Sequence, residues 1–178
     1  EKLKTEVILM HTTNLYPTPH NLVRLGGMEE LMSAFPNIPI GLSDHTTDNL
    51  SSYAAITLGA SIIEKHYTDS YSRIGPDIIC SMDEDSCREL IVNSKLIKSM
   101  LGGKKIAADE EKVTINFAFS TVVSIEEINE GETLTSKNIW VKRPGTGEIK
   151  AENYNKVLGR KAIKNIKKDK HLNWSDFE

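Results

Sequence analysis

The sequence contains only two cysteines, Cys80 and Cys87. Small secreted domains that depend on disulfides carry many more, so a disulfide framework is excluded and two reduced thiols are expected. Long apolar runs are also missing, because none approaches the roughly 20 residues that a membrane-spanning helix needs. No signal peptide is recognisable, since the apolar run after the charged start is short. These absences predict a cytoplasmic protein with no membrane partner.

An excess of basic residues is missing too. The 22 Lys and Arg stand against 25 Asp and Glu, which gives a formal net charge of −3. Nucleic-acid-binding domains are usually strongly basic, so no nucleic-acid partner is expected. What the sequence does have is a 39% apolar fraction over 178 residues. That is enough for one large domain, or for one medium and one small domain.

Strand-like apolar runs alternate with segments of helical period through the first hundred residues. Alternation of this kind predicts an α/β fold with parallel strands, and strand spacings of about 32 and 23 residues suit a (β/α)8 TIM barrel. Three units cannot close a barrel, so the alternatives are a small open sheet and the C-terminal portion of a barrel that lacks about five preceding units. We expect the barrel portion, over residues 1–101. Strands are expected over 6–11, 37–43 and 60–67, and helices over 21–35, 47–59 and 82–101.

The character of the sequence changes after residue 101. Residues 102–119 show no clear amphipathic period and are expected to form a linker. Short apolar segments separated by turn signals follow over 120–178, with turns at 129–131 and 144–147. They predict a small, mostly β domain with one short helix over 150–159.

Polar residues follow each expected strand, at the edge where parallel sheets bind ligands. Side chains of a strand alternate between its faces, so Ser43 shares a face with His45, and Glu64 shares one with His66. His45 and His66 could therefore bind one divalent metal ion, or they could be two hydrogen-bonded histidines at strand ends. Ser43 and Asn14 suit a phosphate or carboxylate, and ordinary turn capping is the alternative.

Two aspartates near these strand ends have weaker patterns. Asp77 follows a Gly-Pro pair that fixes its loop, and a solvated loop aspartate is the alternative. Asp44 lies on the face opposite to His45, where we expect it only to orient its neighbours or to cap the following turn.

Five segments in this order resemble the sialic acid synthase family. They are HTTNLYPTP, GLSDHTTDN, IIEKHYTD, GPDIICSM and NIWVKRPGTG. The family comprises bacterial N-acetylneuraminate synthases of capsule pathways and their legionaminate and pseudaminate relatives. The resemblance covers essentially the whole chain and implies the end of a TIM barrel followed by an SAF (antifreeze-like) domain. It also implies a domain-swapped homodimer in which each SAF domain caps the partner's barrel.

The resemblance further implies the reaction, the cofactor and the site residues. Phosphoenolpyruvate (PEP) and N-acetylmannosamine would condense to N-acetylneuraminate and phosphate with a divalent metal, usually Mn2+, with Mg2+ or Co2+ as alternatives. His45 and His66 would bind the metal, and Glu64 would be a carboxylate near it. The remaining matched positions would bind PEP (Asn14 and Ser43), the sugar (Tyr16 and Asp77) and the sugar's N-acetyl group in the partner's site (Arg143). The family often has proline where this chain has Ile74.

Four alternatives stay open at this point. The enzyme could be a legionaminate or pseudaminate synthase that uses a diacetamido-6-deoxy hexose. The histidines could belong to a zinc hydrolase, which would act without PEP. The last domain could be a carbohydrate-binding or an ice-binding module. We also expect the 178-residue segment to be inactive by itself.

Overall fold

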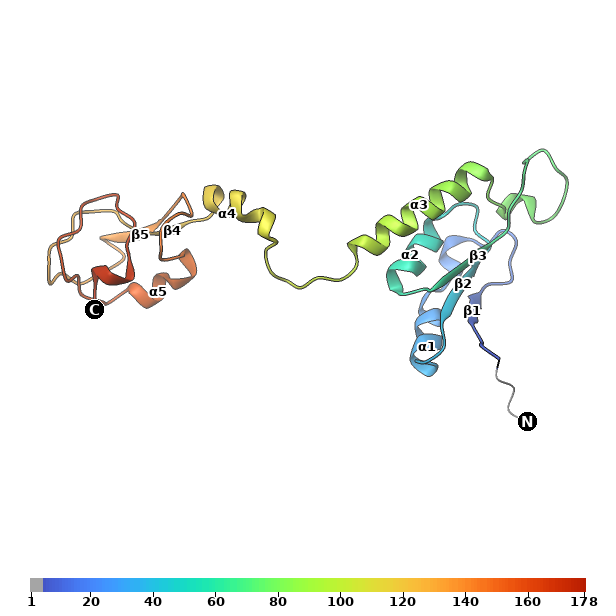
Figure 1. Cartoon of the computed structure of the whole chain (residues 1–178), viewed down its shortest axis with the longest axis horizontal. Helices are drawn as coiled ribbons and strands as arrows, with labels where there is room; N and C mark the ends of the chain where they lie inside the picture. The colour runs from blue at the N-terminus through green and yellow to red at the C-terminus, as the bar shows by residue number, and fades with distance from the viewer. Residues whose placement is uncertain (1–4) are drawn as a thin grey trace. The chain divides into compact units, whose positions relative to one another are not determined.

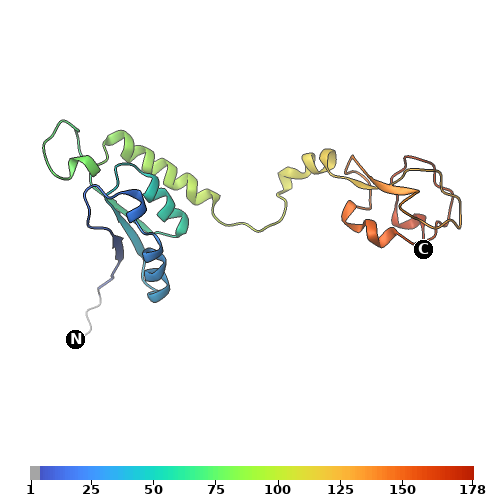
Figure 2. The same cartoon turned by 180° about the vertical axis from the view of Figure 1, so that it is seen from behind.

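The computed structural model describes residues 5–178, which form two compact units. The first unit ends at Gly103 and the second begins at Lys104 (Figures 1 and 2). Within residues 5–178, no helix combines the length and the apolar character that crossing a membrane requires.

A three-stranded parallel sheet in the order β1-β2-β3 forms the centre of the first unit. Ser43 pairs with Thr12 on one side and with Glu64 on the other, so the carboxyl ends of the three strands lie side by side. The α/β alternation expected from the sequence is confirmed, with strands that are shorter than predicted. The strands are β1 (Leu9–Thr12), β2 (Ile40–Asp44) and β3 (Ile62–Lys65).

Three helices follow the strands in turn: α1 (Gly26–Ala34), α2 (Leu50–Leu58) and α3 (Glu84–Met100). The helix expected over 21–35 begins five residues late, because Arg24 has a positive φ of 53° that separates it from a single 3-10 turn, His20–Leu22. The N-cap of α2 is Asn49, and the carboxylate of the preceding Asp48 accepts a hydrogen bond from the Leu50 amide. Gly59 ends α2 in the left-handed conformation, which glycine adopts without steric cost.

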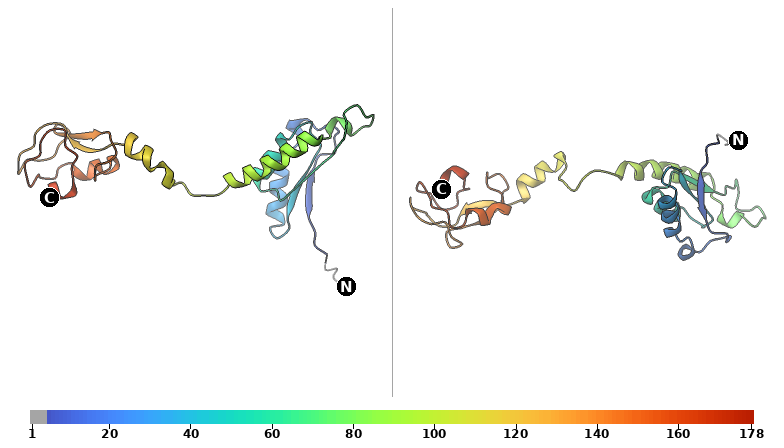
Figure 3. Two further views of the ribbon diagram at one scale, coloured as in Figure 1. Left: turned by 45° about the horizontal axis from the view of Figure 1, so that its top comes forward. Right: turned by 90° about the horizontal axis from the view of Figure 1, so that it is seen from below.

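The helices α1 and α2 pack on one face of the sheet (Figure 3). Ile40 and Leu42 of β2 point to that face, where they join Met28 and Ala55 in a buried apolar cluster. Strand residues of the other parity point to the opposite, open face. Gly41 is on this face, and its missing side chain makes room for Met10 of the neighbouring strand. The open face therefore carries the polar strand ends Ser43 and Glu64.

The second unit is built around one short antiparallel pair, β4 (Thr121–Ser124) and β5 (Ile139–Lys142). Other segments join it through single bridges, such as Val123 with His171 and Ile128 with Ile166. The expected mostly β character is thus only partly right, because frequent turns stop the pairing after a few residues. The expected short helix is present as a 3-10 turn, Ala151–Asn153, followed by α5 (Tyr154–Val157).

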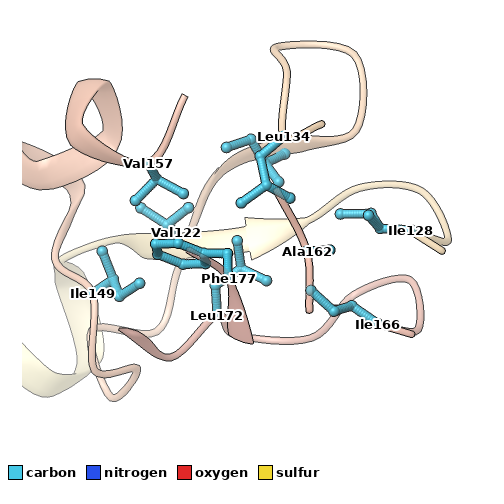
Figure 4. Close-up of a cluster of buried hydrophobic side chains, with 10 residues drawn as sticks. Val122, Ile128, Leu134, Ile149, Val157, Ala162, Ile166, Leu172 and Phe177 are labelled. Atoms are coloured by element: carbon cyan, nitrogen blue, oxygen red, sulfur yellow. The ribbon is translucent and has the colours of Figure 1, made fainter. Parts of the chain in front are cut away.

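Apolar side chains of the second unit converge on one core (Figure 4). Val122, Leu134, Ile149, Val157 and Leu172 are each inaccessible to solvent. They come from segments spread over fifty residues, which explains how a unit with so little regular structure holds together.

The predicted linker over 102–119 is partly wrong. Its second half forms a 3-10 turn, Asp109–Glu111, and α4 (Lys112–Ala118), and both belong to the second unit. The carbonyl of Asn116 accepts a hydrogen bond from the Gly145 amide at 2.8 Å. This contact with a distant loop is a tertiary one, which a search for helical period along the sequence could not detect.

Candidate active site

The side chains of His45 and His66 converge at the carboxyl ends of β2 and β3. Their ring centroids are 5.3 Å apart, and the ring of Tyr16, from the loop after β1, lies 4.1 Å from that of His45. A cavity of about 140 Å³ opens beside them, lined by Ser43, His45, Glu64, Lys65 and His66. Ser43 also contacts Glu64 on the neighbouring strand, so the two pairs meet at the same edge of the sheet, as strand parity predicts.

The surroundings of His45 determine which of its ring nitrogens carries the proton. Its Nδ1 lies 3.0 Å from the carbonyl oxygen of Thr13. A carbonyl oxygen can only accept, so Nδ1 must carry the hydrogen and donate it. In the neutral imidazole, Nε2 then has a free lone pair. Orientation of a histidine by a backbone carbonyl in this way is typical of metal-binding histidines.

His66 is oriented less tightly. Its Nδ1 lies 3.9 Å from Oδ2 of Asp77, which is an ion-pair distance but too long for a hydrogen bond. The side chain of His66 is 35% exposed and that of Asp77 is 48% exposed. The structure thus brings Asp77, which is far along the chain from His45, to the edge of the histidine pair.

Ser43 and Glu64 contact each other on the open face of the sheet. The Ser43 hydroxyl donates a hydrogen bond to Oε1 of Glu64 at 2.7 Å. The two residues are direct partners in the β2–β3 register. A ligand that accepted from the Ser43 hydroxyl would therefore take this proton away from Glu64.

The residues of the loop after β1 are more exposed. Asn14 is exposed to solvent, and Tyr16 is 46% exposed while its ring packs against that of His45 at an interplanar angle of 38°. The loop is held by Thr13, whose hydroxyl donates to the carbonyl of Leu22 at 2.8 Å. Tyr16 therefore forms a wall beside the histidine pair.

Two imidazoles are a suitable donor set for a divalent transition-metal ion. Within residues 5–178, no group of three or more His, Cys, Asp or Glu side chains comes close enough together to hold an ion. A site built on the histidine pair would thus have two protein ligands and would leave open positions for water and substrate.

The sequence reasoning missed a buried ion pair directly behind the histidines. Asp44 and Lys65 lie on the helix side of the sheet, with Nζ 3.1 Å from Oδ2 and side chains that are 1% and 2% exposed. Burial raises the pKa of Asp44, but hydrogen bonds from Ser51 and the Thr46 amide, and the charge of Lys65, outweigh it and hold that pKa below its usual value. The sequence did contain a signal for this ion pair: residues of opposite charge, Asp44 and Lys65, directly precede the two histidines on neighbouring strands.

Arg143 belongs to the second unit and is exposed in the loop that follows β5. Its loop is held at successive residues: the Thr121 hydroxyl donates to the Pro144 carbonyl at 3.2 Å, and Lys150 Nζ donates to the Gly145 carbonyl. A Cβ at Gly145 would lie 2.4 Å from the carbonyl oxygen of Ile115, so only glycine fits there. The sequence RPGTG thus forms a tightly held platform for one exposed arginine.

Comparison with known protein families identifies two matches to this sequence. The model of the NeuB family matches residues 1–106, and that of the SAF domain matches residues 120–178. The chain belongs to the NeuB family. Its α/β unit followed by an SAF domain is therefore shown by sequence as well as by structure, and so is the resemblance stated above to sialic acid synthases.

Known relatives of this NeuB chain include proteins named as sugar-acid synthases. An uncharacterized protein of Methanocaldococcus jannaschii, MJ1065, is 38% identical over 97% of this chain and 51% of its own length. The N,N'-diacetyllegionaminic acid synthase of Campylobacter jejuni is 36% identical over 93% of this chain and 49% of its own length. A solved structure of N-acetylneuraminic acid synthetase from Leptospira borgpetersenii has a TM-score of 0.54 and 32% identity. It covers 61% of this chain and 38% of its own length. The chain spans about half the length of the curated relatives.

Proposed function

We propose that this chain is the C-terminal part of a synthase that condenses PEP with N-acetylmannosamine and releases N-acetylneuraminate and phosphate. The observation that carries the proposal is the convergence of His45 and His66 beside the Ser43–Glu64 pair, at the carboxyl ends of parallel strands. Membership of the NeuB family supports a PEP-dependent sugar-acid synthase. Within this class of enzyme, we propose N-acetylneuraminate as the product.

We also infer that the first unit is the last portion of a (β/α)8 barrel. In a closed barrel, helices cover the outer face of the strands and the inner face carries the site. The first unit has this arrangement, with α1 and α2 on one face and Ser43 and Glu64 on the other. Because about five units would be missing from the barrel, the 178-residue chain by itself should not turn over substrate.

His45 and His66 would hold a divalent cation, for which we propose Mn2+, with Mg2+ or Co2+ as alternatives. When bound, such an ion polarises the carbonyl oxygen of an open-chain sugar as a Lewis acid. The Thr13 carbonyl accepts the Nδ1 hydrogen of His45 and so leaves the lone pair of Nε2 free. This arrangement supports the role of His45 as a metal ligand. The neutral charge of both imidazoles would keep the site electrophilic.

The other residues of the site have roles that suit their positions. Ser43 and Asn14 would hold PEP, and the Ser43 hydroxyl would turn from Glu64 to the ligand. Positive charge develops at C2 of PEP when its C3 attacks the sugar carbonyl, and the freed Glu64 carboxylate would stabilise that charge or orient the attacking water. Tyr16, beside His45, and Asp77, beside His66, would contact the sugar.

Arg143 would complete the site of a second subunit. We propose a domain-swapped homodimer in which the SAF domain of one chain covers the barrel of the other. The platform of Pro144 and Gly145 supports this role, because an exposed arginine on a tightly held loop loses less conformational entropy on binding than one on a flexible loop. An arginine from the partner would help to exclude water from the reaction.

A second candidate is legionaminate synthesis from a diacetamido-6-deoxy hexose, which the similarity to the Campylobacter jejuni enzyme favours. Pseudaminate synthesis remains the related alternative. The test is an assay of the full-length protein with PEP and each hexose in turn, followed by release of phosphate. The hexose with the highest kcat/KM identifies the product, and phosphate release without any PEP would point instead to a hydrolase.

Variants of the two histidines test the site itself. His45→Ala and His66→Ala in the full-length protein should each abolish metal-dependent condensation. His20→Ala is the matched control, because His20 is half-exposed and pairs with Asp48 outside the histidine pair. Turnover at the wild-type rate in either site variant would refute the assignment of the ligands.

A further inference from the structure

We propose that Asp44 and Lys65 are positioning residues. They fix the register of β2 and β3, so that His45 and His66 lie side by side at the ends of the two strands. The proposal rests on the proposed function, because that function assigns metal binding to the two histidines. Asp44 is the last residue of β2 and Lys65 is the last residue of β3, and each is followed directly by a histidine, His45 or His66. Side-chain alternation sends the two charges to the helix face and both imidazoles to the open face.

The two charges are buried and bonded to each other, with Nζ of Lys65 3.1 Å from Oδ2 of Asp44. Neighbouring groups complete the cluster. Oδ1 of Asp44 accepts from the Thr46 amide at 2.9 Å, and Oδ2 accepts from the hydroxyls of Ser51 and Ser52 at 2.7 Å each. Lys65 Nζ donates to the Thr46 carbonyl at 2.7 Å. The cluster thus connects β3 both to β2 and to the turn that follows His45.

A gain in stability is a weak explanation for this buried ion pair. Removing two charges from water is costly, and apolar residues of similar volume often stabilise a protein as well or better. The best-attested use of a buried polar pair is to select one register among several. Here the pair selects the register of two parallel strands, and each partner stands next to a proposed ligand.

The register matters because a slip by one residue turns every side chain of a strand to the other face. Asp44 and Lys65 are direct partners in the β2–β3 ladder. A slip of β3 by one residue would bury a histidine or glutamate against the helices and expose Lys65. With the ion pair intact, the ring centroids of His45 and His66 lie 5.3 Å apart. The pair therefore sets the spacing on which shared binding of one ion depends.

The test compares metal binding by the wild-type full-length protein and by the D44N/K65M double variant, which removes both charges and keeps the volumes similar. Titration with Mn2+, followed by the electron paramagnetic resonance of the free ion, should give a Kd about 10 to 100 times higher in the double variant. Saturating Mn2+ should restore most of kcat, because the ligands themselves are unchanged. Met28→Ala is the control, since it removes a fully buried side chain of the same unit without touching the pair.

Three outcomes decide the proposal. A raised Kd in the folded double variant with an unchanged Kd in Met28→Ala supports it. An unchanged Kd in the folded double variant overturns it, and so does an equal rise in both variants. If the double variant does not fold, S51A/S52A removes two hydrogen bonds to Asp44 and keeps both charges. It should raise the Kd by a smaller factor, and an unchanged Kd there also overturns the proposal.

A metal-free readout separates this inference from the proposed function. The ring-proton chemical shifts of His45 and His66 depend on the adjacent Tyr16 ring, whose centroid lies 4.1 Å and 5.8 Å from theirs. Both shifts should change in D44N/K65M and stay the same in Met28→Ala. If wild-type protein binds no Mn2+ but the shifts change as described, the proposed function fails and the positioning role stands. Unchanged shifts in the folded double variant would refute the positioning role alone.

Discussion

Replacing Gly41 by alanine should destabilise the first unit. A Cβ at this position would lie 2.6 Å from the carbonyl oxygen of Ile62 and 2.6 Å from the sulfur of Met10. Carbon–oxygen contacts are normally about 3.3–3.6 Å, so the methyl group would be ~0.7 Å too close. Met10 has a flexible side chain, but the Ile62 carbonyl belongs to the β3 backbone and can move only with the sheet. Overpacking of this kind costs about 1–3 kcal/mol.

This loss can be measured by urea unfolding. With an m-value of about 2 kcal/mol/M, a loss of about 2 kcal/mol lowers the urea midpoint by about 1 M. Both tryptophans, Trp140 and Trp174, lie in the second unit, so the first unit should be followed by hydrogen exchange of peptides that cover β2 and β3. Tryptophan fluorescence serves as an internal control, because the midpoint of the second unit should not move.

Gly26→Ala is the matched control for Gly41→Ala. A Cβ at Gly26 would meet no atom within 4 Å. This change should be neutral or stabilise the unit by up to about 1 kcal/mol. If Gly41→Ala unfolds at the wild-type midpoint while Gly26→Ala behaves as expected, β2 and β3 do not approach each other as described and the reasoning fails.

Three further outcomes are expected. Gly147→Ala should lower the stability of the second unit by about 1–3 kcal/mol, because its Cβ would lie 2.6 Å from Oγ1 of Thr121 and 2.7 Å from Nδ1 of His171; an unmoved tryptophan-fluorescence midpoint would contradict this. Hydrogen bonds from the Asn129 amide and the Asn138 side chain lower the pKa of Glu132 below 4.5, so its contribution is present above pH 4.5 and is lost as the pH falls through the lowered pKa. Glu132→Gln should therefore flatten the acid side of a stability–pH curve, and an unchanged curve would reject the contribution. In the full-length protein, Arg143→Ala should raise the KM for the sugar, and in mixed dimers the defect should appear in the barrel of the unmutated partner; a defect in the mutated chain's own barrel would exclude the swap.

Much of the first unit was predictable because its signals are local. Apolar runs of strand length and helical periods are read within a dozen residues, and Gly59 ends α2 where the pattern stops. Strand parity likewise predicted that Ser43 and His45 share a face, and in the folded sheet they contact Glu64 and lie beside His66 of the neighbouring strand, respectively. The start of α1 was mispredicted, because the positive φ of Arg24 has no marker such as glycine in the sequence.

The second unit was harder to predict from its sequence. Its turns are local and were recognised, but its strands are only four residues long and most of its pairings are single bridges. Helix α4 was taken for part of a linker, because its contact with Gly145 joins residues that are far apart in the sequence. Contacts of this kind leave no periodic signal.

The sequence by itself determined the alternation of strands and helices, the faces of each strand, and the family to which the motifs belong. The alternation and the strand faces follow from the spacing of residue types along the chain, and the family follows from the resemblance of the five motifs. Only the tertiary structure decided that Asp44 meets Lys65 behind the histidines, that Asp77 lies beside His66, and that the Tyr16 ring packs against His45. Each of these contacts depends on strand register and loop path, and the cooperative packing of the whole unit selects both.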